Sequence, residues 1–167
     1  MKTTKLKTLE EISKIRNEIW VNKKVVLVTG CFDILHIGHV EFFRFAKSLA
    51  DYLVVGVDND QNVKANKGFD RPIFSLEKRI NVLSELQSID VIFPIKEVVK
   101  FNSDEADKML VNIIAKVSPN FLVIHQLGEV AKQRKNDLSR KFSLKVIEDQ
   151  SPKIFSSTKI IEKILKT

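Results

Sequence analysis

A chain of 167 residues with 44 % hydrophobic and 29 % charged side chains has enough apolar material for one folded domain. It has no apolar run near the roughly 18 residues of a membrane span, and its basic N-terminus lacks the apolar segment of a signal peptide. The single cysteine, Cys31, excludes an internal disulfide and a cysteine-rich zinc cluster. We expect one cytoplasmic domain over residues 1–167, with an N-terminal helix (1–20) before an α/β core (25–167).

The 28 Lys and Arg residues outnumber the 21 Asp and Glu residues, which gives a net charge of +7. Such a surplus favours a polyanionic partner such as nucleic acid, an acidic membrane surface or a phosphorylated small molecule, although a basic surface also aids solubility. The basic residues are scattered and are not interleaved with aromatic stacking platforms. We therefore expect neither nucleic acid nor a membrane as the partner.

Apolar residues recur at a helical period in residues 5–20, where Thr8 and Glu11 have the spacing of a capping box. Strands and helices then alternate along the chain, and the polar stretch 58–72 reads as a connection. We expect strands over 23–30, 51–57, 90–95, 120–125 and 144–148. We expect further helices over 38–50, 75–89, 104–117, 128–142 and 156–166. This alternation predicts a Rossmann-like, doubly wound α/β fold with a mainly parallel five-stranded sheet and helices on both faces.

Ligands of such sheets bind in the crevice at the carboxyl ends of the strands. Four segments follow strands and are expected on that one edge: 29–39, 58–71, 125–129 and 150–158. The candidate chemistry of the chain is therefore concentrated in these segments.

His36 and His39 lie in the segment Gly30–His39, GCFDILHIGH, at the start of a predicted helix. Unpaired amides and the helix dipole attract anions there, and two imidazoles can donate hydrogen bonds to a phosphoryl group in transfer. Two other interpretations are a zinc site, which needs a third ligand, and histidines that only cap or pack the helix. Gly30 and Gly38 favour a phosphate ligand, because small residues let it approach the backbone.

Two further segments offer groups suited to phosphates. Lys64, Lys67 and Arg71 follow the second strand and suit a triphosphate, although they fit a solvated loop as well. Residues 156–158 (Ser-Ser-Thr) begin the last helix, where they can cap the helix or hold a phosphate. Cys31 reads as a packed thiol rather than a nucleophile. The chain contains neither a P-loop nor a GxGxxG fingerprint.

The segment GCFDILHIGH resembles the HxGH signature of the cytidylyltransferase-like nucleotidyltransferases. The likeness continues through NVKANKGFDRPIFSLEKRINVLSELQSIDVIF and FSSTKIIEKI, so it covers almost the whole chain. It is greatest to the adenylyltransferase domain of bacterial heptose-phosphate enzymes. This resemblance implies transfer of a nucleoside monophosphate, AMP from ATP or CMP from CTP, to a phosphorylated sugar or alcohol with release of pyrophosphate.

The resemblance also implies roles for individual residues. The catalytic groups would be His36, His39 and Lys64, with Arg71 and Arg79 as substrate or supporting groups. Mg²⁺ would enter with the triphosphate, no protein side chain would bind a metal, and a homodimer is expected. The nucleotide-binding residues would be Gly30, Cys31, Phe32, Asp33, Gly38, His39, Lys67, His125, Ser156, Ser157 and Thr158.

The chain departs from the family pattern in two places. It has neither the RYVDEVI motif nor the arginine before the STT segment that are usual in glycerol-phosphate cytidylyltransferases, since Ser151 stands at the latter position. His125, Gln126 and Leu127 replace a glycine-lined seat for the nucleotide base. The alternatives are therefore a glycerol-3-phosphate-type cytidylyltransferase, an FMN adenylyltransferase, and a nucleotide-binding module without catalysis.

Overall fold

The computed structural model describes residues 4–125, 129–150 and 156–166 of the chain. Its strands form one parallel sheet in the order β3-β2-β1-β4-β5, which confirms the Rossmann-like arrangement. The strands are β1 (Val25–Gly30), β2 (Tyr52–Asp58), β3 (Val91–Ile95), β4 (Phe121–His125) and β5 (Lys145–Asp149).

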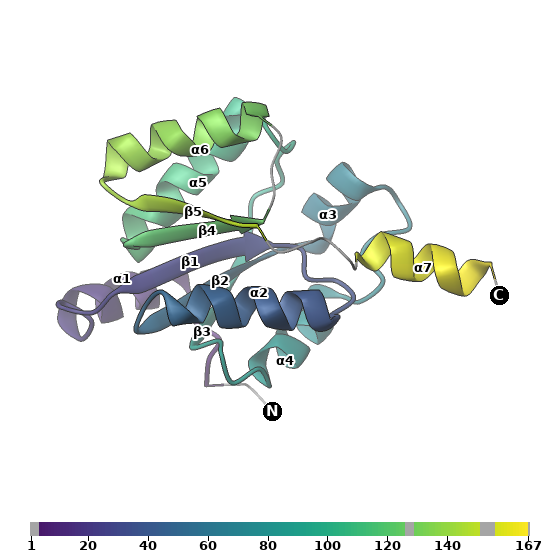
Figure 1. Ribbon diagram of the computed structural model, residues 1–167, viewed down its shortest axis with the longest axis horizontal. Coiled ribbons are helices and arrows are strands. Elements are labelled where there is room, and N and C mark those ends of the chain that lie inside the picture. Colours follow the sequence, from purple (N-terminus) through teal and green to yellow (C-terminus); the bar gives the residue numbers. More distant parts are fainter. Residues whose placement is uncertain (1–3, 126–128, 151–155, 167) are drawn as a thin grey trace.

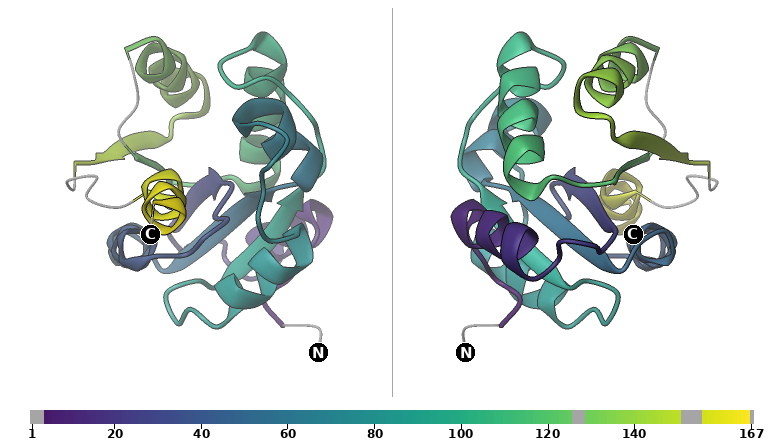
Figure 2. Two further views of the ribbon diagram at one scale, coloured as in Figure 1. Left: turned by 90° about the vertical axis from the view of Figure 1, so that its right-hand side faces the viewer. Right: turned by 90° about the vertical axis from the view of Figure 1, so that its left-hand side faces the viewer.

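Helices cover both faces of the sheet (Figures 1 and 2). α5 and α6 lie on one face, with α1 packed against α5, and α2 and α4 lie on the other. α3 and α7 lie beyond the carboxyl ends of the strands, on the right in Figure 1. The helices are α1 (Leu9–Glu18), α2 (Ile37–Ser48), α3 (Asp60–Lys67), α4 (Leu76–Ser84), α5 (Asp104–Val117), α6 (Glu129–Phe142) and α7 (Ser157–Leu165).

The central strand β1 divides the hydrophobic core into two layers. Val25 and Leu27 point to the α1 and α5 face, while Val26 and Val28 point to the α2 and α4 face. All four side chains are fully buried. A strand covered on both faces needs apolar residues at every position, which explains the unbroken run in the sequence.

The N-terminal helix is shorter than the sequence predicts. The helical pattern begins at residue 5, but α1 begins at Leu9, capped by Thr8 and Glu11 as expected. Before it, Lys7 donates to the carbonyl of Ile92 (2.9 Å) and Ile92 donates to the carbonyl of Lys5 (2.8 Å). This bridge satisfies backbone groups at the edge of β3, which would otherwise be exposed for pairing.

The sequence interpretation of residues 58–72 as a connection is wrong in its first half, because α3 occupies residues 60–67. This helix buries a single apolar side chain, Val63, and so shows no helical hydrophobic period. The predicted helix 75–89 is also shorter: α4 ends at Ser84, and turns complete the segment.

An aromatic stack joins the N-terminal segment to the sheet. The rings of Trp20, which follows α1, and Tyr52, the first residue of β2, have centroids 4.1 Å apart and planes inclined by 17°. Trp20 also donates its backbone N–H to the carbonyl of Ile15 (2.9 Å). The stack therefore fixes the end of α1 against the amino end of β2.

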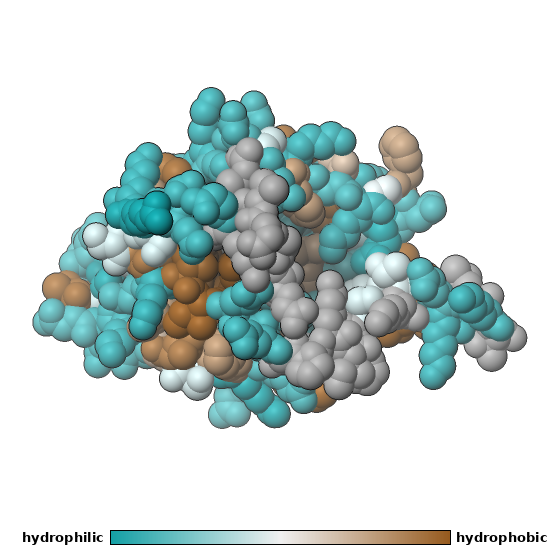
Figure 3. Space-filling model, turned by 45° about the horizontal axis from the view of Figure 1, so that its top comes forward, coloured by the Kyte–Doolittle hydropathy of each residue, from teal (hydrophilic) through white to brown (hydrophobic). Residues whose placement is uncertain are grey.

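The surface in Figure 3 is largely hydrophilic, with a group of hydrophobic side chains reaching it between polar ones. Within residues 4–125, 129–150 and 156–166, no helix is long and apolar enough to cross a membrane.

Candidate active site

The residues that follow β1 and β2 meet at the carboxyl edge of the sheet, together with the start of α7. Lys67 of α3 and His125 at the end of β4 both lie within electrostatic range of His39 of α2. The hydroxyl of Ser157, the first residue of α7, donates to the carbonyl of Ile34 (3.3 Å). The structure thus brings segments from four parts of the sequence to one edge.

His36 and His39 form a close pair at the start of α2. Their ring centroids are 3.9 Å apart, and the backbone N–H of His36 donates to Nδ1 of His39 (3.4 Å). Because Nδ1 accepts this bond, the proton of a neutral His39 ring resides on Nε2. His39 can therefore donate a hydrogen bond through Nε2–H.

Burial and neighbouring cations keep the His39 ring uncharged. Burial is the main cause that lowers the pKa of His39 to about 4, and the positive charges of His36, Lys67 and His125 lower it further. Burial also lowers the pKa of His36. Both shifts favour the neutral form of the imidazole, which can still donate one hydrogen bond.

Gly30 and Gly38 each lie close to an aromatic side chain. A Cβ atom on Gly30 would lie 3.0 Å from Cζ of Phe32, and one on Gly38 would lie 3.1 Å from the His36 ring.

Phe32 has a left-handed backbone (φ 49°), and its buried ring packs on Phe43 at 5.0 Å between centroids. Backbone strain of this kind is concentrated at functional sites.

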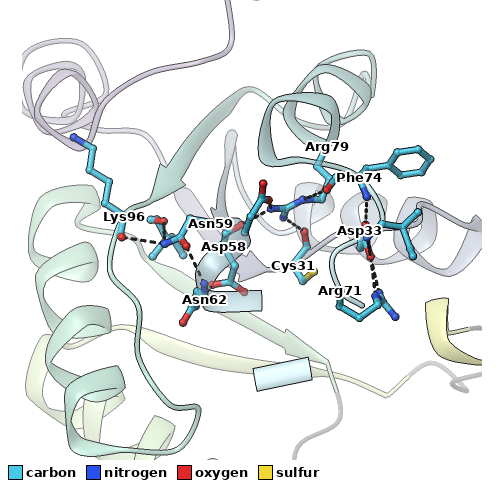
Figure 4. Close-up of polar contacts among 12 residues, drawn as sticks. Cys31, Asp33, Asp58, Asn59, Asn62, Arg71, Phe74, Arg79 and Lys96 are labelled. Atoms are coloured by element: carbon cyan, nitrogen blue, oxygen red, sulfur yellow. Dashed lines mark hydrogen bonds and ion pairs between the residues drawn. The ribbon is translucent and has the colours of Figure 1, made fainter. Parts of the chain in front are cut away.

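Asp33 binds the loop that follows α3 (Figure 4). Its carboxylate accepts from Nε of Arg71 (2.9 Å) and from the backbone N–H groups of Ile73 (2.8 Å) and Phe74 (2.9 Å). Nη2 of Arg71 completes an ion pair at 2.8 Å. Arg71 is therefore engaged inside the protein, unlike the solvated third cation that the sequence suggests.

Arg79 of α4 is almost fully buried and joins four segments (Figure 4). It donates to the carbonyls of Cys31, Asp58 (2.7 Å) and Phe74 (3.0 Å), and it pairs with Asp60 at 2.8 Å. The guanidinium has several fixed donors, so one side chain can satisfy all these acceptors. Arg79 thus fixes the ends of β1 and β2 relative to α3.

Cys31 is buried, and burial raises the pKa of its thiol. A thiol that stays protonated at neutral pH is a poor nucleophile, so the packed-thiol interpretation fits the geometry. Lys67 lies within electrostatic range of Cys31, while Lys64 and Lys67 are both exposed on α3.

His125 contacts an acidic residue that sequence reasoning missed. Its Nδ1 lies 3.4 Å from Oδ2 of Asp149, the residue opposite it on β5, and its ring meets Phe42 edge-on at 6.1 Å. Asp149 is buried. The signal in the sequence was its position directly after the predicted strand 144–148. No group of three His, Cys, Asp or Glu residues suited to a metal occurs in the part of the chain that the structure describes.

The Ser-Ser-Thr segment lies as expected at the start of the last helix. Ser156 accepts a backbone bond from Ile160 (3.0 Å), and Thr158 is exposed in the first turn of α7. Gln126, Leu127 and Ser151, where the chain departs from the family pattern, lie outside the described residues.

Comparisons with known proteins agree with this arrangement. A model of the family described as cytidylyltransferase-like matches residues 27–163. Two similar proteins, both named bifunctional protein HldE, come from Campylobacter concisus (44 % identity over 119 residues) and Coxiella burnetii (35 % over 141 residues). The matches cover 71 % and 84 % of this chain but 23 % and 28 % of those proteins. The chain thus spans about a quarter of the length of these relatives.

Two solved structures share the fold. The lipopolysaccharide core biosynthesis protein of Thermoplasma volcanium GSS1 aligns with a TM-score of 0.59 and 27 % identity over 76 % of this chain and 96 % of that one. The pantoate-beta-alanine ligase of Francisella tularensis aligns with a TM-score of 0.61 and 19 % identity over 97 % and 78 % of the two chains. With its family signature at the carboxyl edge of a five-stranded parallel sheet, the chain belongs to the cytidylyltransferase-like nucleotidyltransferases.

Proposed function

We propose that this chain transfers AMP from ATP to a sugar 1-phosphate and releases pyrophosphate, as a heptose 1-phosphate adenylyltransferase does. The observation that carries the proposal is the pair of neutral imidazoles, His36 and His39, at the start of α2 with Lys67 within electrostatic range. Its likeness to the HldE proteins supports a sugar phosphate as the acceptor.

In the proposed step, an oxygen of the acceptor phosphate attacks the α-phosphorus of ATP. A new P–O bond forms, the bond from the α-phosphorus to the bridging oxygen breaks, and pyrophosphate leaves with that electron pair. The nucleophile is already ionised at neutral pH, so the step needs no general base. Positioning and charge stabilisation can then supply the rate enhancement.

His36 and His39 would donate hydrogen bonds to the α-phosphate, where negative charge accumulates. Lys64 and Lys67 would neutralise the β- and γ-phosphates and the acceptor phosphate. Ser156, Ser157 and Thr158 would bind the terminal phosphates at the start of α7. Arg71 and Arg79 would support the site through the internal contacts described above.

Mg²⁺ would enter as part of the MgATP substrate, bound to phosphate oxygens. This fits the donors present, because the described residues offer hydrogen-bond donors and cations at this edge rather than a cluster of three potential metal ligands. The protein would then bind the ion through the phosphates.

The test is an assay of pyrophosphate release from ATP and from CTP, each with heptose 1-phosphate, glycerol 3-phosphate and FMN. We expect turnover with ATP and the sugar phosphate, and a fall of about 10²–10³-fold in kcat when His39 is replaced by Ala. A preference for CTP with glycerol 3-phosphate would identify a glycerol-3-phosphate-type cytidylyltransferase instead. Turnover of ATP with FMN in place of the sugar phosphate would identify an FMN adenylyltransferase. ATP binding in calorimetry without turnover on any acceptor would refute the proposed reaction.

A further inference from the structure

The last residues of β4 and β5 form a polar pair on the face of the sheet that α2 covers. His125 and Asp149 are register partners in the parallel ladder. Two residues earlier on these strands, Val123 is buried in the hydrophobic layer on that face and Ile147 packs against the layer. Side chains alternate between the faces of a strand, so His125 and Asp149 continue this row to the carboxyl edge. The row therefore changes from apolar to ionisable at the edge where the nucleotide is proposed to bind.

Asp149 contacts the His125 ring at one of its two nitrogens. Oδ2 of Asp149 lies 3.4 Å from Nδ1 of His125, and the side chains are 6 % and 34 % exposed, respectively. The carboxylate thus lies inside the protein, while the ring reaches the surface. A neighbouring carboxylate favours a ring proton on Nδ1, so Nε2 of the neutral ring is a hydrogen-bond acceptor.

His125 lies on the same side of α2 as His39. The ring of His125 meets the ring of Phe42 edge-on, with 6.1 Å between centroids. Phe42 follows His39 by three residues on α2, so the two side chains lie on one face of the helix. Phe42 is also farther from the start of α2, where anions are attracted. His125 therefore lies beside the proposed phosphate-binding residues but farther along the helix.

The surroundings of His125 suit a neutral ligand group better than a phosphate. Asp149 places a carboxylate next to the ring, and Phe42 adds an apolar surface. A carboxylate repels a phosphate, whereas it does not repel an uncharged nucleotide base. The exocyclic amino group of adenine or cytosine is an uncharged N–H donor. Such a group matches the acceptor at Nε2 of His125.

We propose that Nε2 of His125 accepts a hydrogen bond from the exocyclic amino group of the nucleotide base, and that Asp149 is the positioning residue that keeps the ring in this tautomer. This inference rests on the proposed function and names the part of the nucleotide that is recognised. Asp149 acts through His125 and touches no substrate. A base with a carbonyl oxygen in place of the amino group would face one acceptor with another, so it would be disfavoured.

The test compares ATP with inosine triphosphate, which has a carbonyl oxygen where ATP has the amino group. Pyrophosphate release is measured with the same sugar phosphate as the acceptor. We expect the wild-type chain to prefer ATP by about 10–100-fold in kcat/KM. His125→Phe retains a ring and removes the acceptor, so this preference should fall by about tenfold.

Asp149→Asn is combined with His125→Phe in a double-mutant cycle. Asn has the shape of Asp, but its amide can donate to Nδ1, which moves the ring proton to Nε2 and removes the acceptor. We expect Asp149→Asn alone to lower the preference for ATP as far as His125→Phe does. In the His125→Phe background it should change the preference by less than about twofold. A carboxylate that only stabilises the fold would not change the ratio between the two nucleotides.

The tautomer is measured independently by NMR of the imidazole nitrogens. The chain has three histidines, so comparison with His125→Phe identifies the signals of His125. At about pH 8, where an ordinary histidine is neutral, we expect the His125 proton on Nδ1 in the wild-type chain and on Nε2 in Asp149→Asn. A wild-type ring with its proton on Nε2 would overturn the proposal.

Asp137→Asn is the matched control, because it makes the same substitution at a side chain of α6 that is 61 % exposed. It should leave the preference for ATP unchanged. Thermal unfolding is recorded for every variant, and Asp149→Ser replaces Asp149→Asn in the cycle if the latter is not folded at the assay temperature. Equal losses of kcat/KM with the two nucleotides in His125→Phe would place His125 against a part that both share, which contradicts the proposal.

The failure of this inference can be distinguished from the failure of the proposed function. A wild-type chain that transfers AMP without preferring ATP to inosine triphosphate refutes the inference alone. A chain that uses CTP, or that binds ATP without transfer, refutes the proposed function alone. The preference is then measured between CTP and UTP, or on the Kd values for ATP and inosine triphosphate by calorimetry. A chain that binds neither ATP nor CTP refutes both proposals.

Discussion

Asp33 and Arg71, 38 residues apart in the sequence, form an ion pair that joins the histidine turn to the loop after α3. The Asp33 side chain is 1 % exposed, and Arg71 is the cation that pairs with it. We expect Arg71→Leu to lower the free energy of unfolding by about 3 kcal/mol, because the acid is left buried without its cation. Urea unfolding measures the change.

Arg44→Leu is the control for that measurement, since Arg44 is an exposed arginine on α2. It should change the free energy of unfolding by no more than about 0.5 kcal/mol. Equal effects of the two substitutions would show that the Asp33 pair contributes nothing beyond a surface arginine.

The lowered pKa of His39 predicts a loss of stability in acid. The unfolded chain binds a proton at this ring near pH 6.5, whereas the folded chain does so only near pH 4. Between these values the unfolded state holds more protons, so the free energy of unfolding falls as the pH falls, by up to about 3 kcal/mol from this group. Urea unfolding from pH 7 to pH 4.5 tests this. His39→Gln should make the dependence shallower, and an unchanged slope would contradict the assignment.

Gly38→Ala should separate stability from activity. Gly38 lies in the first turn of α2, where alanine is favoured over glycine by up to about 1 kcal/mol. Its new Cβ would lie 3.1 Å from the His36 ring, which must then move. We expect the melting temperature to stay level or rise, while kcat for pyrophosphate release falls about tenfold. Full activity would show that the position of His36 is not critical.

Thr8 caps α1 with two reciprocal hydrogen bonds to Glu11, and the bond to the Thr8 backbone is the main cause that lowers the pKa of Glu11. Thr8→Ala should reduce the free energy of unfolding by about 1 kcal/mol. Thr8→Ser, which retains the hydroxyl, should restore most of it. A serine variant as unstable as the alanine variant would point to the lost methyl group instead.

The sequence was a good guide to the sheet because its strands are apolar at every position, as β1 illustrates. It failed at α3, where Val63 is the one buried apolar residue and side-chain amides bind residues 99–101. Such contacts join segments more than 30 residues apart, so no local period reveals them.

In the candidate site, too, local sequence patterns were predictable and contacts between distant segments were not. The motif and its place after a strand predicted that His36 and His39 lie at the carboxyl edge. The pairing of Asp33 with Arg71 depends on how two loops meet in space, and the sequence therefore suggested a free cation.

Trp20 and Tyr52 are the only tryptophan and the only tyrosine of the chain, and they are stacked on each other. The intrinsic ultraviolet fluorescence of the protein therefore arises at a single junction. Tyr52 begins β2, whereas the proposed nucleotide-binding edge lies where the strands end. A red shift of the emission would thus report release of the α1 segment from the sheet, so unfolding can be followed without a label while the opposite edge is titrated with nucleotide.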